Sequence, residues 1–246
     1  MAPQYQDLQS AVRHVLLTRP AVQSQRFGRS LRAALAVPLH VMIAPLMAPA
    51  YLAPVLPLPA PQGLIFSSET GVTAFARLPI RPVAPAWCVG ERTAKAALSA
   101  GLEPVVVARD VAALLARMIA LRPSGPFLHL RGKDSTGNLT HCLTDAGIVA
   151  ADAIIYDQRP VPLAPRALRL LQGPHPVVVP VFSARSMHLL CAAAPPGAQL
   201  RIAALSPAVA AAMFSHPQAE VAVCPSPDAK SMLRIVISLL REPALP

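Results

Sequence analysis

Charged and aromatic residues are scarce in this chain. Of its 246 residues, 14% are charged and 4% are aromatic, whereas 54% are hydrophobic, a balance that excludes a disordered polymer. The four cysteines, Cys88, Cys142, Cys191 and Cys224, show no CxxC and no close Cys/His spacing, so we expect reduced thiols and no disulfide. The histidines are dispersed, and HExxH, GxGxxG and GxxxxGK[ST] are all missing. We therefore expect no metal and no cofactor.

Membrane and export signals are also lacking. Residues 37–59 carry no charge but hold six prolines, which disrupt a spanning helix, and we interpret the segment as a connector. The residues before Arg13 contain no continuous apolar signal-peptide core. We expect a cytoplasmic protein with no membrane partner.

Lysine is rare, yet the formal net charge is +10, so arginine carries most of it. Arginine grips carboxylates and phosphates with a planar fork, which favours an acidic ligand. A GC-rich genome that enriches Arg, Ala and Pro together explains the excess equally well. No lysine-rich run or known nucleic-acid module is present, so we expect no nucleic-acid partner.

The chain contains a hidden repeat of eight units, each with an apolar run, a small or polar turn and a helical pattern. Three pairs stand in the same order: 64–75 with 180–190, 87–97 with 201–211, and 105–119 with 221–237. The fourth pair is displaced, because 128–143 closes the first series while its counterpart, 16–31, lies at the start of the chain.

This circular shift predicts two similar domains, one inserted into the other. We expect an α/β fold with two parallel-sheet, flavodoxin-like domains joined by a two-stranded linker. The outer, discontinuous domain is residues 1–46 and 160–246, and the inserted domain is 47–159. The chain would cross twice, near 44–62 and 153–165, and a cleft with a double hinge would result.

Ligands of parallel sheets bind at the carboxyl ends of the strands, where helix N-termini favour anions. The turns predicted there contain Arg19, Ser68, Arg131, Ser183 and Ser206. Capping of the following helix is the more common role for such hydroxyls. Tyr156, in the second connector, is able to exchange a proton at a reacting oxygen, and packing in the connector is an equally good explanation.

The chain resembles the uroporphyrinogen-III synthase family, in a form like that of alphaproteobacteria. The matching stretches span 15–237 in order: LLTRP with QSxRF, IAPLM, LIFSSETGV, WCVGERTAKAA, LHLRG, IIYDQ and VFSARS. The resemblance implies a cofactor-independent lyase, active as a monomer, that cyclises the linear tetrapyrrole hydroxymethylbilane to uroporphyrinogen III. Ring D is inverted through a spiro intermediate and water is lost, in porphyrin and heme biosynthesis.

The resemblance also implies roles for single residues. Tyr156 in IIYDQ would assist departure of the hydroxyl, and Thr93 in CVGERTA would contact the substrate. Ser68 and Ser183 match hydroxyls of the two strand–turn motifs. In RIAALSPAVAA, Ala208 stands where some members have threonine, and Ser206 is a substitute hydroxyl. Arg19 and Arg131 are expected carboxylate contacts by their position in the repeat.

Two other functions stay open from the sequence. One is a non-catalytic two-domain protein that binds an anionic ligand by hinge closure. The other is an inactive member of the family that retains the fold.

Overall fold

The computed structural model describes residues 12–56, 60–134 and 137–241. The segment used to judge the signal peptide, apart from residue 12, lies outside these ranges, as do Pro57 and Pro59. The chain divides into two compact units, residues 1–48 with 160–246 and residues 49–159. The expected boundaries, 46/47 and 159/160, lie within two residues of these. No helix among the described residues is long and apolar enough to cross a membrane.

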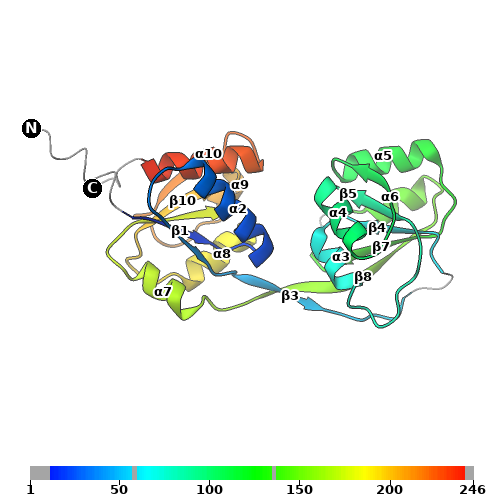
Figure 1. The fold of residues 1–246 in the computed structure, drawn as a ribbon, viewed down its shortest axis with the longest axis horizontal. Coiled ribbons are helices and arrows are strands. Elements are labelled where there is room, and N and C mark those ends of the chain that lie inside the picture. The colour runs from blue at the N-terminus through cyan, green and yellow to red at the C-terminus, as the bar shows by residue number, and fades with distance from the viewer. Residues whose placement is uncertain (1–11, 57–59, 135–136, 242–246) are drawn as a thin grey trace, which may run out of the picture. The chain divides into compact units, whose positions relative to one another are not determined.

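The first unit contains a parallel sheet with the strand order β11-β10-β9-β1-β2. Its strands are β1 (Arg13–Leu17), β2 (Leu39–Ile43), β9 (Val177–Val181), β10 (Leu200–Ala204) and β11 (Glu220–Val223). Its helices are α2 (Ala21–Ala34), α7 (Pro165–Leu171), α8 (Ala184–Ala193), α9 (Pro207–Ala210) and α10 (Ala229–Arg241). Strands β1 and β10 are labelled in Figure 1, with α2, α7, α8, α9 and α10 around them. Helices cover both faces: Val177 and Val179 pack in the core with α7, α8 and α9, while Val178 packs in the core with α2 and α10.

The second unit contains a sheet with the order β3-β8-β7-β4-β5-β6. Its strands are β3 (Met47–Tyr51), β4 (Gly63–Phe66), β5 (Ala86–Val89), β6 (Pro104–Ala108), β7 (Phe127–Gly132) and β8 (Ala150–Pro160). Its helices are α3 (Glu69–Phe75), α4 (Glu91–Ser99), α5 (Val111–Leu121) and α6 (Leu139–Asp145). Phe66 packs in the core with α3 and α4, and the neighbouring Ile65 packs in the core with α5 and α6.

The strand orders confirm the repeat. Read from one edge, β11-β10-β9-β1-β2 corresponds to β6-β5-β4-β7-β8. Four of these five pairs were expected from the sequence, with β1 and β7 as the displaced fourth units, whereas the pair of β2 with β8 was not. The α/β fold with two mostly parallel sheets and one discontinuous domain is therefore confirmed.

The interpretation of residues 37–59 as a connector alone is wrong. Its first part forms β2, a parallel partner of β1, and its middle forms β3. The prolines allow this because Pro38 and Pro45 lie outside the strands, and Pro49 lies in β3 at the edge of its sheet. A missing amide is least costly in an edge strand. The second expected connector is largely β8, whose eleven residues continue past the last pair with β7.

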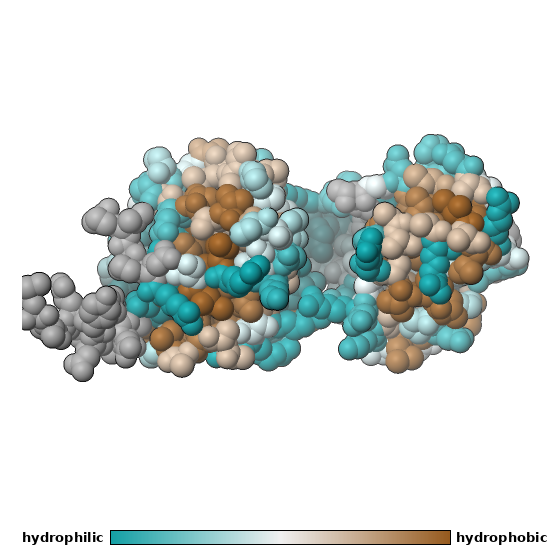
Figure 2. Space-filling view, turned by 90° about the horizontal axis from the view of Figure 1, so that it is seen from above, coloured by the Kyte–Doolittle hydropathy of each residue, from teal (hydrophilic) through white to brown (hydrophobic). Residues whose placement is uncertain are grey.

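Apolar side chains reach the surface on both units, where Figure 2 shows brown patches separated by teal polar groups. On the edge strand β6, Val105 and Val107 are 46% and 45% exposed, since alternate residues of a strand point to opposite faces. Exposed apolar residues of this kind are common on folded proteins.

Candidate functional site

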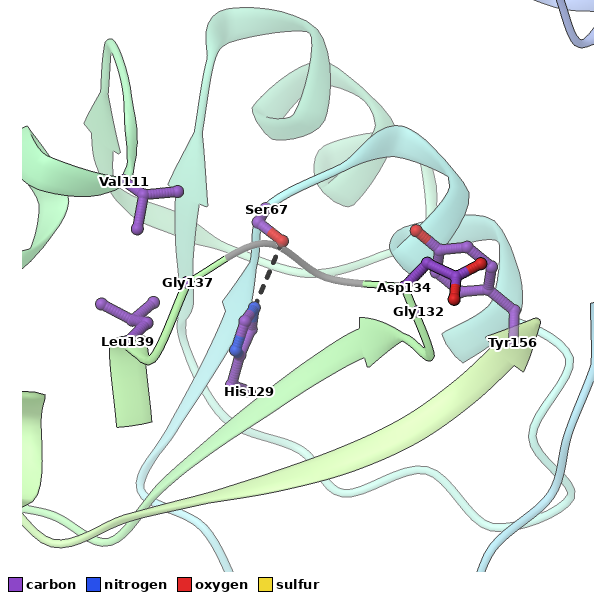
Figure 3. Close-up of a pocket in the computed structure, with 8 residues that line it drawn as sticks. All are labelled: Ser67, Val111, His129, Gly132, Asp134, Gly137, Leu139 and Tyr156. Atoms are coloured by element: carbon purple, nitrogen blue, oxygen red, sulfur yellow. Dashed lines mark hydrogen bonds between the residues drawn. The ribbon is translucent and has the colours of Figure 1, made fainter. Parts of the chain in front are cut away.

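A pocket lies in the second unit at the carboxyl ends of β4 and β7, beside the middle of β8 (Figure 3). Its volume is about 230 Å³. The lining residues are Ser67, Val111, His129, Gly132, Asp134, Gly137, Leu139 and Tyr156. This is the edge of a parallel sheet at which ligands bind.

The phenol of Tyr156 lies in this pocket and contacts Ser68. The Tyr156 hydroxyl and Ser68 Oγ are 3.1 Å apart, and either atom can be the donor. Ser68 is also the N-cap of α3, where its Oγ accepts a hydrogen bond from the Gly71 amide at 3.0 Å. The two predicted residues are thus brought together, and the cap holds the Ser68 oxygen in place beside the phenol.

Gly132, the last residue of LHLRG, lies directly against the Tyr156 ring. It pairs with Tyr156 across β7 and β8, at a point where the register of the two strands shifts. A Cβ atom built on Gly132 would lie 2.6 Å from Cζ of Tyr156. Only glycine leaves this space.

A chain of hydrogen bonds runs from the pocket through His129. The imidazole is 4% exposed, with Nε2 at 3.2 Å from Ser67 Oγ and Nδ1 at 3.1 Å from Asp152 Oδ1. Thr140 Oγ1 donates to Asp152 Oδ2 at 3.0 Å, and Arg131 Nε lies 3.2 Å from the same oxygen. Burial alone raises the pKa of Asp152, but the hydrogen bonds from His129 and Thr140 and the charge of Arg131 outweigh it, so the pKa is lowered overall.

Sequence reasoning missed His129 and Asp152. The sequence held one sign of this site, the histidine in the otherwise apolar segment FLHL. A polar side chain buried in a strand requires hydrogen-bond partners. The partner is 23 residues away along the chain, and only the pairing of β7 with β8 brings it opposite, in the register His129 with Asp152.

Arg131 is turned toward groups of the protein itself. Besides its ion pair with Asp152, its Nη1 donates to the carbonyls of Gly132 at 3.1 Å and Lys133 at 3.4 Å. Its predicted contact with a substrate carboxylate stays a prediction.

Thr93 lies near the start of α4 and is 4% exposed. It is not among the residues that line the pocket of Tyr156. Its predicted contact with the substrate also stays a prediction.

The candidate residues of the first unit lie at the carboxyl ends of its strands. The Arg19 guanidinium carbon is 4.3 Å from the centre of the Phe182 ring, a cation–π contact. Ser183 caps α8 and Ser206 caps α9, since their Oγ atoms accept from the amides of Ser186 and Val209. The capping role considered from the sequence is therefore present at all three candidate serines.

A second hollow, of about 600 Å³, lies at the ends of β5 and β6 beside α4. Among its lining residues, Lys95 and Arg109 are cationic and Glu91 is anionic.

Among the described residues, no group of three or more His, Cys, Asp or Glu side chains has a geometry that holds a metal ion. All four cysteines are free thiols.

Comparison with known proteins gives a consistent result. No curated protein is significantly similar to the chain. A crystal structure of uroporphyrinogen-III synthetase from Helicobacter pylori 26695 covers 92% of this chain and 99% of its own, with 17% identity and a TM-score of 0.66, which shows a shared fold. A mutant uroporphyrinogen III synthase from the extremely thermophilic bacterium Thermus thermophilus aligns over 94% of this chain and 98% of its own, with 15% identity and a TM-score of 0.45, too low to add to the fold assignment.

The model of the family "Uroporphyrinogen-III synthase HemD" matches residues 28–234. That range includes the whole pocket of Tyr156 and both crossings between the units. The chain therefore belongs to the uroporphyrinogen-III synthase family.

Proposed function

We propose that Tyr156 and Ser68 form the reacting end of the site at which this enzyme cyclises hydroxymethylbilane to uroporphyrinogen III. The family is one of cofactor-independent lyases of porphyrin biosynthesis that act on a tetrapyrrole. The observation that carries the proposal is the hydrogen bond between the Tyr156 hydroxyl and Ser68 Oγ, beside a pocket at the carboxyl ends of parallel strands.

The first step needs a proton, because the terminal hydroxyl leaves as water. When Ser68 donates to the Tyr156 oxygen, the phenolic O–H points elsewhere and is able to protonate the departing hydroxyl. The C–O bond breaks and an electrophilic azafulvene remains. Ring D attacks it at its substituted carbon to form the spiro intermediate, which fragments and recloses with the ring inverted. In the last step a pyrrole ring carbon loses a proton, which restores the aromaticity of that ring. This proton replaces the one that was given to the leaving hydroxyl.

Orientation is the harder task, since direct closure without an enzyme gives the symmetric type I isomer. Holding a flexible chain in one reactive geometry is worth several kcal/mol, up to roughly 7–11 kcal/mol in well-oriented systems. The hydrogen bond from the Gly71 amide to Ser68 and the fit of Tyr156 against Gly132 both support a preorganised site.

The substrate carries an acetate and a propionate on every ring, and the positive charge of the chain suits it. Residues 49–152 hold nine Lys/Arg and seven Asp/Glu, whereas the rest holds thirteen and five. We assign carboxylate binding to Arg19 and Arg131, and hydroxyl contacts to Ser183, Ser206 and Thr93. The enzyme acts as a cytoplasmic monomer on this small molecule, without a nucleic-acid partner.

The test is an isomer assay. The protein is mixed with freshly made hydroxymethylbilane, the products are oxidised to porphyrins, and types I and III are separated by chromatography. We expect the type III isomer to predominate. Faster loss of substrate with type I alone would instead identify a binding protein or an inactive member.

A further inference from the structure

Ser67, His129 and Asp152 form a polar relay that has no part in the function described so far. Ser67 Oγ lies 3.2 Å from His129 Nε2, and Nδ1 of the same ring lies 3.1 Å from Asp152 Oδ1. Ser67 and His129 line the pocket that also contains the phenol of Tyr156 (Figure 3). A relay built around a buried imidazole fixes which atoms donate and which accept.

The partners of Asp152 set the direction of the hydrogen bonds. Its Oδ2 receives the Thr140 hydroxyl and faces the Arg131 guanidinium, so Oδ1 is an acceptor for His129. In the neutral ring, Nδ1 must then carry the hydrogen, and Nε2 is left as an acceptor. Ser67 is the group beside Nε2, so its hydroxyl hydrogen is committed to His129. Toward the pocket, Ser67 Oγ therefore presents only its lone pairs, so it acts there as a hydrogen-bond acceptor.

We propose that Ser67 Oγ is a hydrogen-bond acceptor for a pyrrole N–H of the substrate, and that His129 and Asp152 are positioning residues that hold the hydroxyl in this orientation. The inference rests on the proposed function, because it assigns a group of that substrate. A pyrrole N–H donates only, whereas a carboxylate accepts only and would find no donor at Ser67. Pockets for drug-sized ligands are about 300–1,000 Å³, and this one, at about 230 Å³, suits one ring rather than the whole chain.

The substitution Asp152→Asn tests the relay with little change of shape. The Asn oxygen is held toward Thr140 and Arg131, which are both donors, so its amino group faces His129. Nδ1 then becomes the acceptor, Nε2–H donates to Ser67 Oγ, and the Ser67 hydrogen turns into the pocket. A donor would there meet the donor of the substrate.

The readout is a double-mutant cycle in the type III assay at pH 8. We expect Asp152→Asn and Ser67→Ala each to lower kcat/KM about tenfold, the size of one lost hydrogen bond. In the Ser67→Ala background, Asp152→Asn should change kcat/KM less than about twofold, because the acceptor, Ser67 Oγ, is already gone. The matched control, Asp145→Asn, removes an exposed carboxylate of α6 and should leave the rate unchanged. Additive effects of the two substitutions would overturn the inference.

A second measurement does not depend on activity. Nitrogen-15 NMR of the wild type should show His129 with hydrogen on Nδ1 and a bare Nε2, and Asp152→Asn should reverse this. A wild-type ring with hydrogen on Nε2 contradicts the inference even if no variant folds. A wild type that forms no type III isomer, by contrast, refutes the proposed function itself.

Discussion

The Tyr156 ring lies over the α-carbon of Gly132, so closely that a methyl group at residue 132 would lie 2.6 Å from Cζ and 2.9 Å from the hydroxyl oxygen. Gly132 ends β7 and Tyr156 lies opposite it in β8. The glycine thus sets the height of the phenol above the sheet, and with it the distance to Ser68.

Gly132→Ala should therefore displace the ring of Tyr156. We expect a loss of roughly 1–3 kcal/mol in the free energy of unfolding from overpacking, and a fall of at least tenfold in type III formation. Denaturant unfolding and the isomer assay measure the two. In a Tyr156→Ala background the same substitution should cost much less stability, and an equal cost in both backgrounds would show that the ring is not what is displaced.

Tyr156→Phe removes the proton donor and keeps the ring. General-acid assistance is typically worth about 10²–10⁴-fold, although a good leaving group needs less of it. We expect kcat to fall at least tenfold, with the unfolding transition nearly unchanged. Near-normal turnover by a folded variant would show that the phenol is dispensable.

Ser68→Ala removes both the cap of α3 and the partner of the phenol. Loss of the cap should cost about 1 kcal/mol in unfolding free energy, and kcat should fall as well. Asp110→Ala is the control, because Asp110 caps α5 by accepting from the Ala113 amide at 2.7 Å and does not contact Tyr156. It should lose similar stability and retain its turnover; if both variants lose turnover equally, the Ser68 effect is one of stability alone.

Stability should rise with pH in the range just below 6.5 because of a histidine cluster in the first unit. His14 Nδ1 lies 3.2 Å from His40 Nδ1, and the His14 ring stacks on His175. Burial, then the charges of His40 and His175, lower the pKa of His14 from 6.5. The unfolded chain therefore binds this proton more readily than the folded chain. The contribution of neutral His14 to the free energy of unfolding is complete above pH 6.5, and it is lost as the pH falls toward and through the lower pKa of the folded state.

Denaturant unfolding across this range checks the expectation. His14→Asn should flatten the pH dependence of the unfolding free energy. A steeper slope in His14→Asn would contradict the sign.

Thiol reactivity should distinguish Cys142 from the other cysteines. Burial raises the pKa of Cys88 to about 11, and burial followed by the charge of Asp228 raises the pKa of Cys224. Cys191 is buried as well, whereas Cys142 is partly exposed. A disulfide reagent at pH 8 should modify about one thiol per native chain quickly, and Cys142→Ser should abolish that phase. Rapid reaction of two or more thiols in the native protein would contradict this.

Periodicity alone identified eight strand–helix units and their order, because apolar spacing is a local property of the chain. The displacement of the unit at 16–31 was enough to imply one sheet interrupted by another. β2 and β3 were missed, because six prolines in 37–59 masked a strand pattern. Prolines outside the strands, or in an edge strand, do not break hydrogen-bonded pairs.

Sequence by itself determined which residue types stand at the strand ends, including the cap serines Ser68, Ser183 and Ser206, and it singled out Tyr156 in the second connector. Tertiary structure decided which of them meet. The pairing of β7 with β8 places Tyr156 against Gly132 and Asp152 against His129, and β4 brings Ser67 and Ser68 beside them. These contacts join residues up to 88 positions apart, and their register depends on packing across a whole sheet, which no local pattern encodes.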